Sequence, residues 1–416
     1  MSPAQRALLA EHVADASALL AAIRRSEVVP LGPAALGRIA TAPRRALVDV
    51  PSADNSQMDG YAVAGADLTA AGQEVQLAPA AMIAAGSGIG RLEPGTAAAI
   101  MTGAPVPEGA DQIVPVEEAA DGRFAAEGEA VRLTPTVIES GRFVRRRGSD
   151  TEAGDTVLRE GDVLTPARIS HLAACGITDV DVAAPVRCAV ISTGSEVTDP
   201  AGGDLAPGAA FDANGPGLAA ALTAAGAEVV RIAVVPDDAE ELLAVVQSAV
   251  REDGAELIVT SGGVSKGAME PVRHAAEHPE AELTFTAIAM QPGGPQGIGT
   301  VSVNGARVPW IAVPGNPVSA LMSCEVILRP ALGAAPRQRM CLPVVLDAPE
   351  ASPAGKDQYR RARILTDGRL RFVGGPSSHL IGGMARCDAL ALVPIGVESV
   401  NDGDLLETIL LPAGLL

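Results

Sequence analysis

Four polar, glycine- or proline-containing segments each follow an apolar stretch of the chain, and their residue types suit the binding of an anion. They read Ser192-Thr193-Gly194-Ser195-Glu196, Pro236-Asp237-Asp238, Ser261-Gly262-Gly263-Val264-Ser265-Lys266-Gly267 and Pro314-Gly315-Asn316-Pro317. In the third, glycines let backbone N–H groups approach an anion and two hydroxyls can donate hydrogen bonds. That segment does not match the P-loop pattern, which disfavours ordinary nucleotide hydrolysis. One such segment could be a simple tight turn, but four together favour a site.

Three carboxylates, Glu196, Asp237 and Glu270, are attached to these segments. Facing a ligand that carries phosphate, carboxylates usually hold Mg²⁺ or a water molecule. The alternative is that they cap helices or complement the helix dipole. Asp237 is the strongest candidate for a cap, because a helical pattern begins directly after it.

Two other polar segments stand apart from these loops. Residues 54–61 place five polar side chains and a tyrosine in one short stretch, and an Asp-Gly turn accounts only for Asp59 and Gly60. Arg142, Arg145, Arg146 and Arg147 cluster in an otherwise acidic chain. In an extended segment Arg145 and Arg147 share a face and could clamp an oxyanion. The alternative is a solvated charge run paired with surface acids.

The periodicity of the chain predicts the elements that must position these residues. Residues 187–332 alternate apolar strands with helices, which predicts a parallel, doubly wound α/β sheet with ligands beyond the carboxyl ends of its strands. Residues 1–45 have a helical pattern, and 141–183 read as a strand and a helix. Residues 46–140 and 336–416 read as β-rich, the latter with a hairpin at Asp367-Gly368.

Composition excludes several classes of function. A net charge of −19 repels nucleic acid and anionic membranes, and 2% aromatic residues leave little for base stacking. No apolar run is long enough to predict a membrane span. The five cysteines are scattered without a C-x-x-C pair, and the chain shows no signal-peptide pattern. We therefore expect a cytoplasmic protein without a zinc site.

Taken together, the segments resemble the molybdopterin molybdenumtransferase family, which includes the E-domain of gephyrin. The matching stretches occur in the family's order and cover nearly the whole chain. They are residues 54–63, 100–111 (Ile100-Met101-Thr102-Gly103-Ala104-Pro105-Val106-Pro107-Glu108-Gly109-Ala110-Asp111), 145–150 (Arg145-Arg146-Arg147-Gly148-Ser149-Asp150), 192–196, 261–265 and 314–320.

The resemblance implies a homodimer of four-domain protomers. The predicted domains are a discontinuous helical linker domain (1–46 and 141–183), a β-rich insert (47–140), a molybdopterin-binding α/β domain (184–333) and a C-terminal β-barrel (334–416). The implied reaction inserts molybdate into adenylated molybdopterin and releases AMP in the presence of Mg²⁺. The family's site is formed by the α/β domain of one protomer and the β insert of the other. The implied protein partners are the molybdopterin adenylyltransferase and apo-molybdoenzymes.

The family's functional positions carry over by motif to residues of this chain. The predicted catalytic residues are Asp59, Asp150, Glu196, Asp237 and Glu270, with Asp237 and Glu270 as metal ligands. The predicted substrate-binding residues are Asn55, Ser56, Thr102, Arg145, Ser261, Gly262, Gly263, Ser265, Lys266, Pro314, Gly315, Asn316, Pro317 and Ser378. Glu270 stands where many members have Asp.

One departure matters for function. Many members read Lys-Pro-Gly-Lys-Pro where this chain reads Gln291-Pro292-Gly293-Gly294-Pro295, so two positive charges near the anionic substrate are missing. Lys266 could replace one of them, or it could be a solvated lysine. The departure motivates two alternatives to the enzyme: a catalytically weak, molybdopterin-binding or scaffold protein, and an adenylyltransferase built on the same α/β module. The retained acids argue against the first and the β insert against the second.

Overall fold

The computed structural model describes residues 7–86, 88–199, 201, 204–265 and 270–411. The chain forms two compact units, one of residues 1–26 with 183–416 and one of residues 27–182. The predicted division into four domains remains a prediction. In the described part, no helix is both long and apolar enough to cross a membrane.

A six-stranded sheet forms the centre of the first unit, in the order β15-β12-β16-β20-β19-β17. The first four strands are parallel, and β19 and β17 extend the sheet in antiparallel fashion. The strands are β12 (Arg187–Thr193), β15 (Glu228–Val235), β16 (Leu257–Ser261), β17 (Ala281–Ala287), β19 (Pro295–Val303) and β20 (Ala306–Val313).

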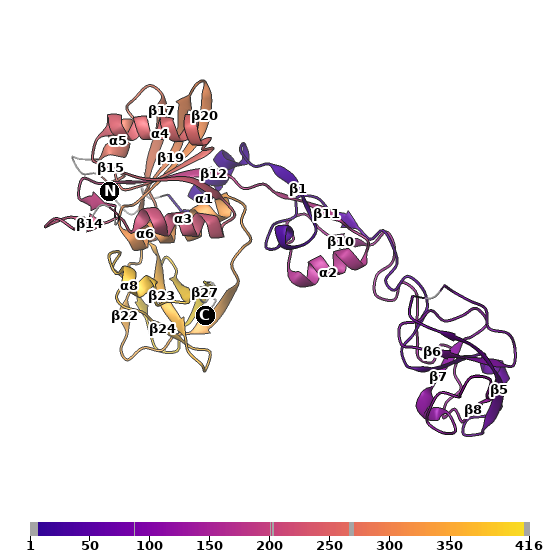
Figure 1. Cartoon of the computed structure of the whole chain (residues 1–416). Helices are drawn as coiled ribbons and strands as arrows, with labels where there is room; N and C mark the ends of the chain where they lie inside the picture. The colour runs from indigo at the N-terminus through magenta and orange to yellow at the C-terminus, as the bar shows by residue number, and fades with distance from the viewer. Residues whose placement is uncertain (1–6, 87, 200, 202–203, 266–269, 412–416) are drawn as a thin grey trace. The chain divides into compact units, whose positions relative to one another are not determined.

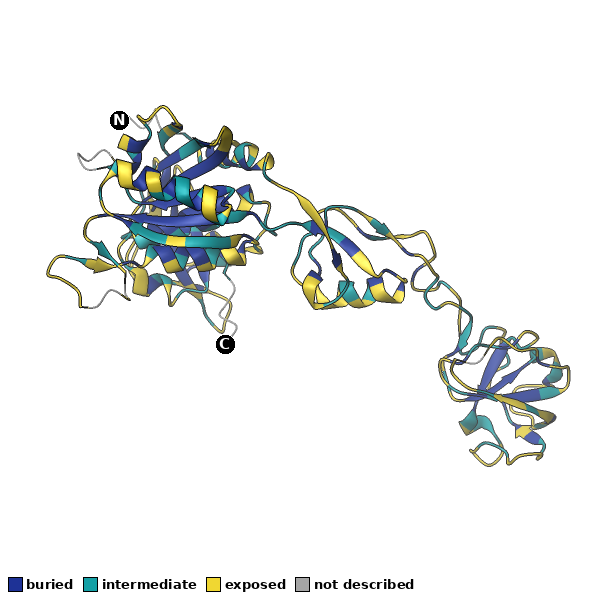
Figure 2. Cartoon of the chain, turned by 45° about the horizontal axis from the view of Figure 1, so that its top comes forward, coloured by how far each residue is buried: buried dark blue, intermediate teal, exposed yellow. Residues whose placement is uncertain are grey.

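Helices cover both faces of this sheet, with α3 (Asn214–Ala224) and α6 (Pro317–Ser323) on one face and α4 (Ala239–Asp253) and α5 (Pro271–Ala275) on the other (Figure 1). Alternate residues of β12 serve the two cores: Cys188 and Val190 join the α3 side, whereas Ala189 and Ile191 join the α4 side. Strands buried on both faces explain the continuous apolar runs of the sequence (Figure 2). This arrangement confirms the predicted α/β architecture.

The N-terminal helix α1 (Leu9–Ala21) belongs to the same unit, where Ala16 and Leu20 are fully buried in the core beside α3. The helical pattern expected over residues 1–45 therefore ends early, and that prediction was wrong beyond Ala21. A strand, β1 (Ser26–Pro30), follows instead. Two adjacent valines favour an extended backbone there, and Pro30 cannot donate the N–H that a continuing helix would need.

The C-terminal part of the first unit is β-rich, as predicted. Its sheet has the order β18-β23-β25-β27-β21, with β24 paired to β23. The strands are β18 (Met290–Gln291), β21 (Arg339–Pro343), β23 (Asp357–Ile364), β24 (Leu370–Phe372), β25 (Ala389–Val393) and β27 (Leu405–Leu410). The hairpin predicted at Asp367-Gly368 is present between β23 and β24. One bridge joins Val344, just past β21, to Leu370, but closure into a barrel remains a prediction.

The second unit carries a five-stranded sheet in the order β7-β4-β6-β5-β8 and three short strand pairs, β1-β11, β2-β10 and β3-β9. Its strands are β2 (Arg44–Arg45), β3 (Asn55–Ser56), β4 (Gly60–Val63), β5 (Val75–Ile83), β6 (Thr96–Ile100), β7 (Gln112–Pro115), β8 (Val131–Leu133), β9 (Val144–Arg145), β10 (Thr156–Leu158) and β11 (Asp179–Ala183). Helix α2 (Pro166–Ala174) begins at Thr165, whose side chain accepts a hydrogen bond from the Arg168 N–H. The predicted β-rich insert is thus observed as a sheet with its own core.

A half-buried ion pair joins two loops of this second unit. The guanidinium of Arg142 donates to both carboxylate oxygens of Glu118, at 2.6 and 2.8 Å. These hydrogen bonds lower the pKa of Glu118 from 4.5 to about 2, against the opposing effect of burial. Because the folded pKa is depressed, the stabilisation is complete above pH ~4.5 and is lost as the pH falls towards ~2.

We predict that Glu118→Gln lowers the free energy of unfolding by about 1–3 kcal/mol at pH 7, since the substitution leaves Arg142 half-buried without its charged partner. The difference from wild type should shrink progressively below pH ~4.5. Urea unfolding at pH 7 and pH 3 measures both effects. Glu117→Gln, which neutralises the exposed neighbouring acid, is the matched control and should leave stability unchanged within about 0.5 kcal/mol. An equal loss at both pH values would contradict the assignment.

Candidate functional site

The predicted loops of the α/β sheet line one pocket of about 550 Å³ in the first unit. This volume lies within the range of small-molecule sites. Ten of the predicted residues line it: Glu196, Asp237, Gly262, Gly263, Ser265, Glu270, Pro314, Gly315, Asn316 and Pro317. The prediction that the ends of β12, β15, β16 and β20 meet at one edge is therefore confirmed.

Glycines allow two of these loops to touch. Gly262 has φ +95°, and a Cβ there would lie 2.6 Å from the Thr193 hydroxyl and 2.7 Å from its carbonyl oxygen. A Cβ on Gly315 would lie 3.2 Å from the Gly262 Cα. Side chains at these positions would push the loops apart, so glycine is required by the backbone contact as well as by the turn. The close contact holds the Ser-Gly-Gly loop against the end of β12 and the Pro-Gly loop at the pocket, while the Gly262 N–H itself donates to the Val313 carbonyl at 3.0 Å.

Asp237 and Asp238 have different roles. Asp238 is the N-cap of α4, since its Oδ1 accepts from the N–H groups of Glu240 and Glu241 at 2.9 Å each. Asp237 instead faces the β12 loop: its Oδ2 accepts from the Ser195 N–H at 3.1 Å, and its own N–H donates to the Ser195 hydroxyl at 3.1 Å. The cap interpretation of Asp237 was therefore wrong, because the helix begins one residue later than that interpretation required.

Glu270 precedes α5, but its side chain forms no cap with that helix. Its Oε2 accepts a hydrogen bond from the Ser265 N–H at 3.0 Å, which ties the carboxylate to the Ser-Gly-Gly loop. Lys266, predicted to bind substrate from this loop, lies outside the described residues. Glu270, Asp237 and Glu196 thus bring three carboxylates to one pocket.

Two predicted residues of this unit do not line the pocket. Ser261 is buried, and its hydroxyl donates to the Ser192 hydroxyl at 3.4 Å, beneath the pocket floor. Ser378 approaches α6 through its backbone, where its carbonyl accepts from the Val318 N–H at 3.3 Å. Gln291 is directed to the C-terminal sheet, and its Oε1 accepts from the Gln358 amide at 3.0 Å.

The sequence analysis missed a fifth segment that lines the pocket, Phe211 to Asn214. Asp212 is buried, and its Oδ1 accepts from the Ser192 hydroxyl at 2.8 Å and from the N–H groups of Asn214 and Gly215 at 3.0 Å. The signal was present in the sequence as an Asp-x-Asn-Gly run directly before an apolar helix. Asp212 fixes the start of α3 against the end of β12.

In the second unit, Asp59 and Thr102 form a tight pair. Asp59 is exposed, and its Oδ1 accepts from both the N–H and the hydroxyl of Thr102, each at 2.7 Å. The backbone N–H and then the hydroxyl of Thr102 lower the pKa of Asp59. The carboxylate is therefore held in its charged form, with one oxygen engaged by Thr102.

Arg145 differs from the rest of the arginine cluster. Arg142 pairs with Glu118, Arg146 with Asp54 at 2.7 Å and Arg147 with Asp49, so all three are paired with acids as the alternative interpretation predicted. Arg146 and Arg147 are also exposed, whereas the Arg142 pair is half-buried. Among the described residues, Arg145 has no ion-pair partner, and it is exposed on β9. It remains able to bind an anion.

The other predicted residues of the second unit lie near β3. Asn55 pairs with Arg145 across β3 and β9, and its side-chain oxygen is buried without a hydrogen-bond partner in the described structure. Ser56 is fully buried, and its hydroxyl donates to the Met58 carbonyl, so it serves the segment itself. Asp150 is exposed and follows the same arginine segment, where its N–H donates to the Val50 carbonyl.

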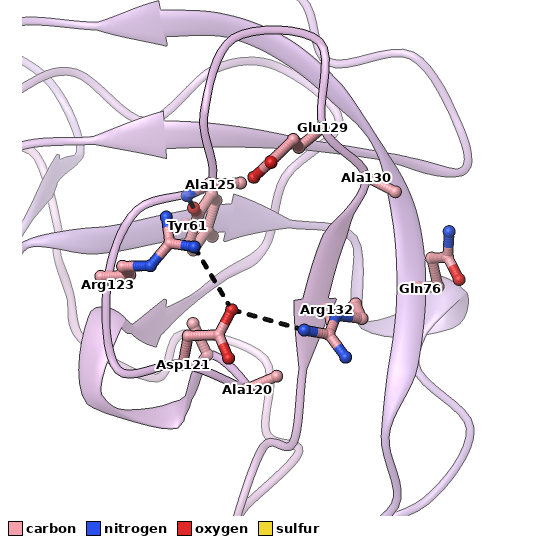
Figure 3. A pocket seen from close by; sticks show the side chains of 10 residues that line it. Tyr61, Gln76, Ala120, Asp121, Arg123, Ala125, Glu129, Ala130 and Arg132 are labelled. Atoms are coloured by element: carbon pink, nitrogen blue, oxygen red, sulfur yellow. Dashed lines mark hydrogen bonds and ion pairs between the residues drawn. The ribbon is translucent and has the colours of Figure 1, made fainter.

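A second hollow, of about 380 Å³, lies on the same unit beside Tyr61 (Figure 3). Its charged side chains are engaged with one another, because Asp121 pairs with Arg123 at 3.6 Å and with Arg132 at 3.4 Å. The Tyr61 hydroxyl accepts from the Ala125 N–H at 2.7 Å. The sequence analysis predicted no site residue for this hollow.

Comparison with known proteins gives matches over nearly the whole chain. Family models match at residues 7–176 (MoeA N-terminal region, domains I and II), 189–334 (probable molybdopterin binding domain) and 343–411 (MoeA C-terminal region, domain IV). The chain is 41% identical to molybdopterin molybdenumtransferase 2 of Mycobacterium tuberculosis, covering 86% of this chain and 89% of the relative. It is 32% identical to the molybdopterin molybdenumtransferase of Synechococcus elongatus, covering 95% and 96%.

Solved structures agree with these matches. The crystal structure of a molybdopterin biosynthesis MoeA protein from Pyrococcus horikoshii superposes with a TM-score of 0.77 and 28% sequence identity. The match covers 98% of this chain and 99% of that one. The resemblance seen in the motifs therefore extends to the fold.

We predict that Asp238→Ala destabilises the protein by about 1 kcal/mol, because α4 loses its N-cap. Asp237→Asn should change the free energy of unfolding by less than about 0.5 kcal/mol, because the amide oxygen can still accept from Ser195. Urea unfolding of both variants measures the difference. Equal destabilisation by the two substitutions would show that Asp237 contributes to the free energy of unfolding through its charge as well as through its two hydrogen bonds.

Proposed function

The chain belongs to the family of molybdopterin molybdenumtransferases, and we propose from this membership and from its pocket that it inserts molybdate into adenylated molybdopterin, releasing AMP. The observation that carries the proposal is the meeting of three carboxylates, Glu196, Asp237 and Glu270, with two glycine-rich backbone loops in one pocket. That pocket lies within the residues that match the molybdopterin binding domain.

In this proposal the backbone N–H groups of Gly263 and Gly315 bind the phosphate groups of the substrate, because the Gly262 N–H already donates to Val313 and Pro314 has no N–H. Such amides are fixed in position by the close approach of Gly262 to Thr193 and Gly315. They therefore need little reorganisation when charge develops on a departing phosphate. Ser265 adds a hydroxyl at the same loop.

The carboxylates fit a magnesium ion in the manner common for phosphate substrates. Mg²⁺ prefers oxygen ligands and is usually held by one or two carboxylates together with substrate phosphates. Asp237 and Glu270 line the pocket and would be the ligands. Among the described residues no group of three or more His, Cys, Asp or Glu side chains is placed to hold a metal ion, so in this proposal the substrate phosphates complete the coordination. When bound, Mg²⁺ would neutralise charge on the phosphate oxygens.

Glu196 and Asp237 have a second task that needs no metal. A carboxylate beside the scissile phosphate can orient a water molecule or accept its proton. Asp237 is positioned for this by its two hydrogen bonds with Ser195, which fix the loop after β15 against the loop after β12. Glu196, on the same loop as Ser195, lines the pocket beside it.

Asp59, Thr102 and Arg145 form a second set of residues that we assign to the same reaction. Thr102 holds the carboxylate of Asp59 in its charged form, and Arg145 offers an exposed guanidinium. An arginine without an acid partner suits an oxyanion such as molybdate. We also propose the homodimer, the cytoplasmic location and the two protein partners, the adenylyltransferase and apo-molybdoenzymes, that follow from the family resemblance.

One observation supports a second candidate function, a molybdopterin-binding protein of low activity. Gln291 stands where many family members have lysine, and it is bonded to Gln358 of the C-terminal sheet. A neutral amide at this position offers no charge to an anionic substrate. Activity measurements separate this candidate from the enzyme, because both bind molybdopterin and only the enzyme releases AMP at a catalytic rate.

The decisive experiment incubates the purified protein with adenylated molybdopterin, molybdate and Mg²⁺. We expect AMP release together with activation of an apo-molybdoenzyme, and we expect chelation of divalent metal to abolish both. Tight binding of molybdopterin without AMP release would favour the low-activity candidate.

We predict that Asp59→Asn reduces molybdenum insertion at least about tenfold, which is about 1.4 kcal/mol at the transition state. The fold should be retained, because the Asn oxygen can still accept from Thr102, and the melting temperature should match wild type. Asp67→Asn is the matched control, since Asp67 also accepts a backbone N–H, from Gly95, on the same unit. Wild-type insertion by Asp59→Asn would remove Asp59 from the reaction.

The same variant tests the proposed dimer. Light scattering should give the mass of two chains for wild type and for Asp59→Asn. Co-expression of Asp59→Asn with Asp237→Asn should restore part of the activity, because each mixed dimer would carry one intact set of residues. A monomeric mass with full activity would rule out the homodimer.

A further inference from the structure

Phe211 is an exposed aromatic side chain in a pocket. All eight aromatic residues of the chain lie in the described part, and Phe211, at 44% exposure, is the one that the structure leaves exposed. It ends the short strand β14 (Ala210–Phe211) and lines the pocket that also contains Glu196, Asp237 and Glu270. Burying a phenylalanine stabilises a protein by about 1.5–3 kcal/mol, so an exposed ring leaves apolar surface available to a ligand.

Asn214 lines the same pocket three residues further along, at the start of α3. Its Nδ2 donates to the Gly315 carbonyl at 2.7 Å, which fixes the orientation of the amide. Its Oδ1 is buried and has no hydrogen-bond partner in the described structure. A buried acceptor without a donor is unfavourable, so a ligand N–H group that donates to this oxygen would contribute favourably to the free energy of binding.

We propose that Phe211 and Asn214 together bind a planar nitrogen heterocycle that carries N–H groups. The ring stacks on the face of Phe211, and an N–H of its edge donates to Oδ1 of Asn214. This inference rests on the proposed function, in which the substrate has two such rings, the pterin and the adenine. The ring would lie beside the loops that bind the phosphates, since all these residues line one pocket.

Phe211 and Asn214 would select different chemical features of the ligand. Stacking on Phe211 requires a flat ring and tolerates many ring types. The acceptor of Asn214 requires a donor at the ring edge, so it rejects a ring that presents a carbonyl oxygen there. Together they would select an amino-bearing heterocycle, and we assign them as specificity-determining residues.

The test measures binding of AMP and of molybdopterin separately to the full chain and its variants. Phe211→Ala and Phe211→Leu should weaken binding of one of the two ligands about tenfold, whereas Phe211→Trp should retain it within about threefold. The ligand that weakens identifies the ring. Ile395→Ala removes an apolar side chain of similar exposure, 43%, outside the pocket and should change neither affinity.

Asn214 is tested from the ligand side. If adenine is the ring, a purine nucleotide that lacks the amino group should bind the wild-type protein about fivefold more weakly than AMP binds it. The Asn214→Ala variant should bind the two nucleotides with equal affinity. If the pterin is the ring, the same cycle uses a pterin without its amino group. With adenylated molybdopterin, Phe211→Leu should raise KM more than it lowers kcat, because stacking on the ring would stabilise the bound substrate and the transition state alike.

Two results would overturn the inference. One is wild-type affinity of Phe211→Ala for both ligands in a protein that releases AMP. The other is unchanged affinity with an altered mass by light scattering, which would assign Phe211 to a protein contact. A wild-type protein that binds a ring through Phe211 and releases no AMP would instead refute the proposed function and leave the ring site standing.

Discussion

The shared register of four parallel strands determines where the pocket forms. Ser192 of β12 is paired with Ser261 of β16, and Ser261 with Val313 of β20, so the loops that follow these strands begin at the same height. On the other side Thr193 is paired with Val235 of β15, two residues before Asp237. A slip of one residue in any strand would turn its side chains to the opposite face and displace its loop. The buried apolar residues of both cores prevent such a slip.

A buried polar network then joins the strand ends at the wall of the pocket, where Ser192 and Asp212 are lining residues. The Ser261 hydroxyl donates to the Ser192 hydroxyl, which donates to the Asp212 carboxylate, and Asp212 in turn accepts from two backbone N–H groups of α3. Buried polar groups of this kind stabilise a structure only when each is satisfied. Asp212 thereby connects β16, β12 and α3, and its position determines where Phe211 and Asn214 lie. Ser261, predicted to bind substrate, is better explained as part of this support.

Sequence reasoning could predict the sheet and its loops because each apolar strand ends in a distinct run of glycine, serine or proline. It could not separate Asp237 from Asp238, because both fit the start of a helix and only the helix boundary decides between them. It could not show that, among the described residues, Arg145 has no acid partner while its neighbours are paired, since Asp54, Asp49 and Glu118 are distant in sequence. Phe211 was missed for a similar reason: the exposure of a single aromatic residue depends on packing, and the low aromatic content argued only against base stacking by nucleic acid.

The charge of the pocket constrains the proposed binding of phosphate. Its described lining contains the acids Glu196, Asp212, Asp237 and Glu270 and no lysine or arginine. In the proposed function, repulsion between these carboxylates and an anionic substrate must be offset by backbone N–H groups, by a bound cation, or by positive side chains that are not part of this described lining. Backbone amides alone carry only partial charge, so a divalent cation is the strongest single source of compensation. Gln291 and Gly294 stand where many family members have lysine and supply no positive charge, so the proposed reaction would depend more strongly on that cation. The same argument gives the proposed ring site more weight, because stacking on Phe211 supplies affinity that does not depend on charge.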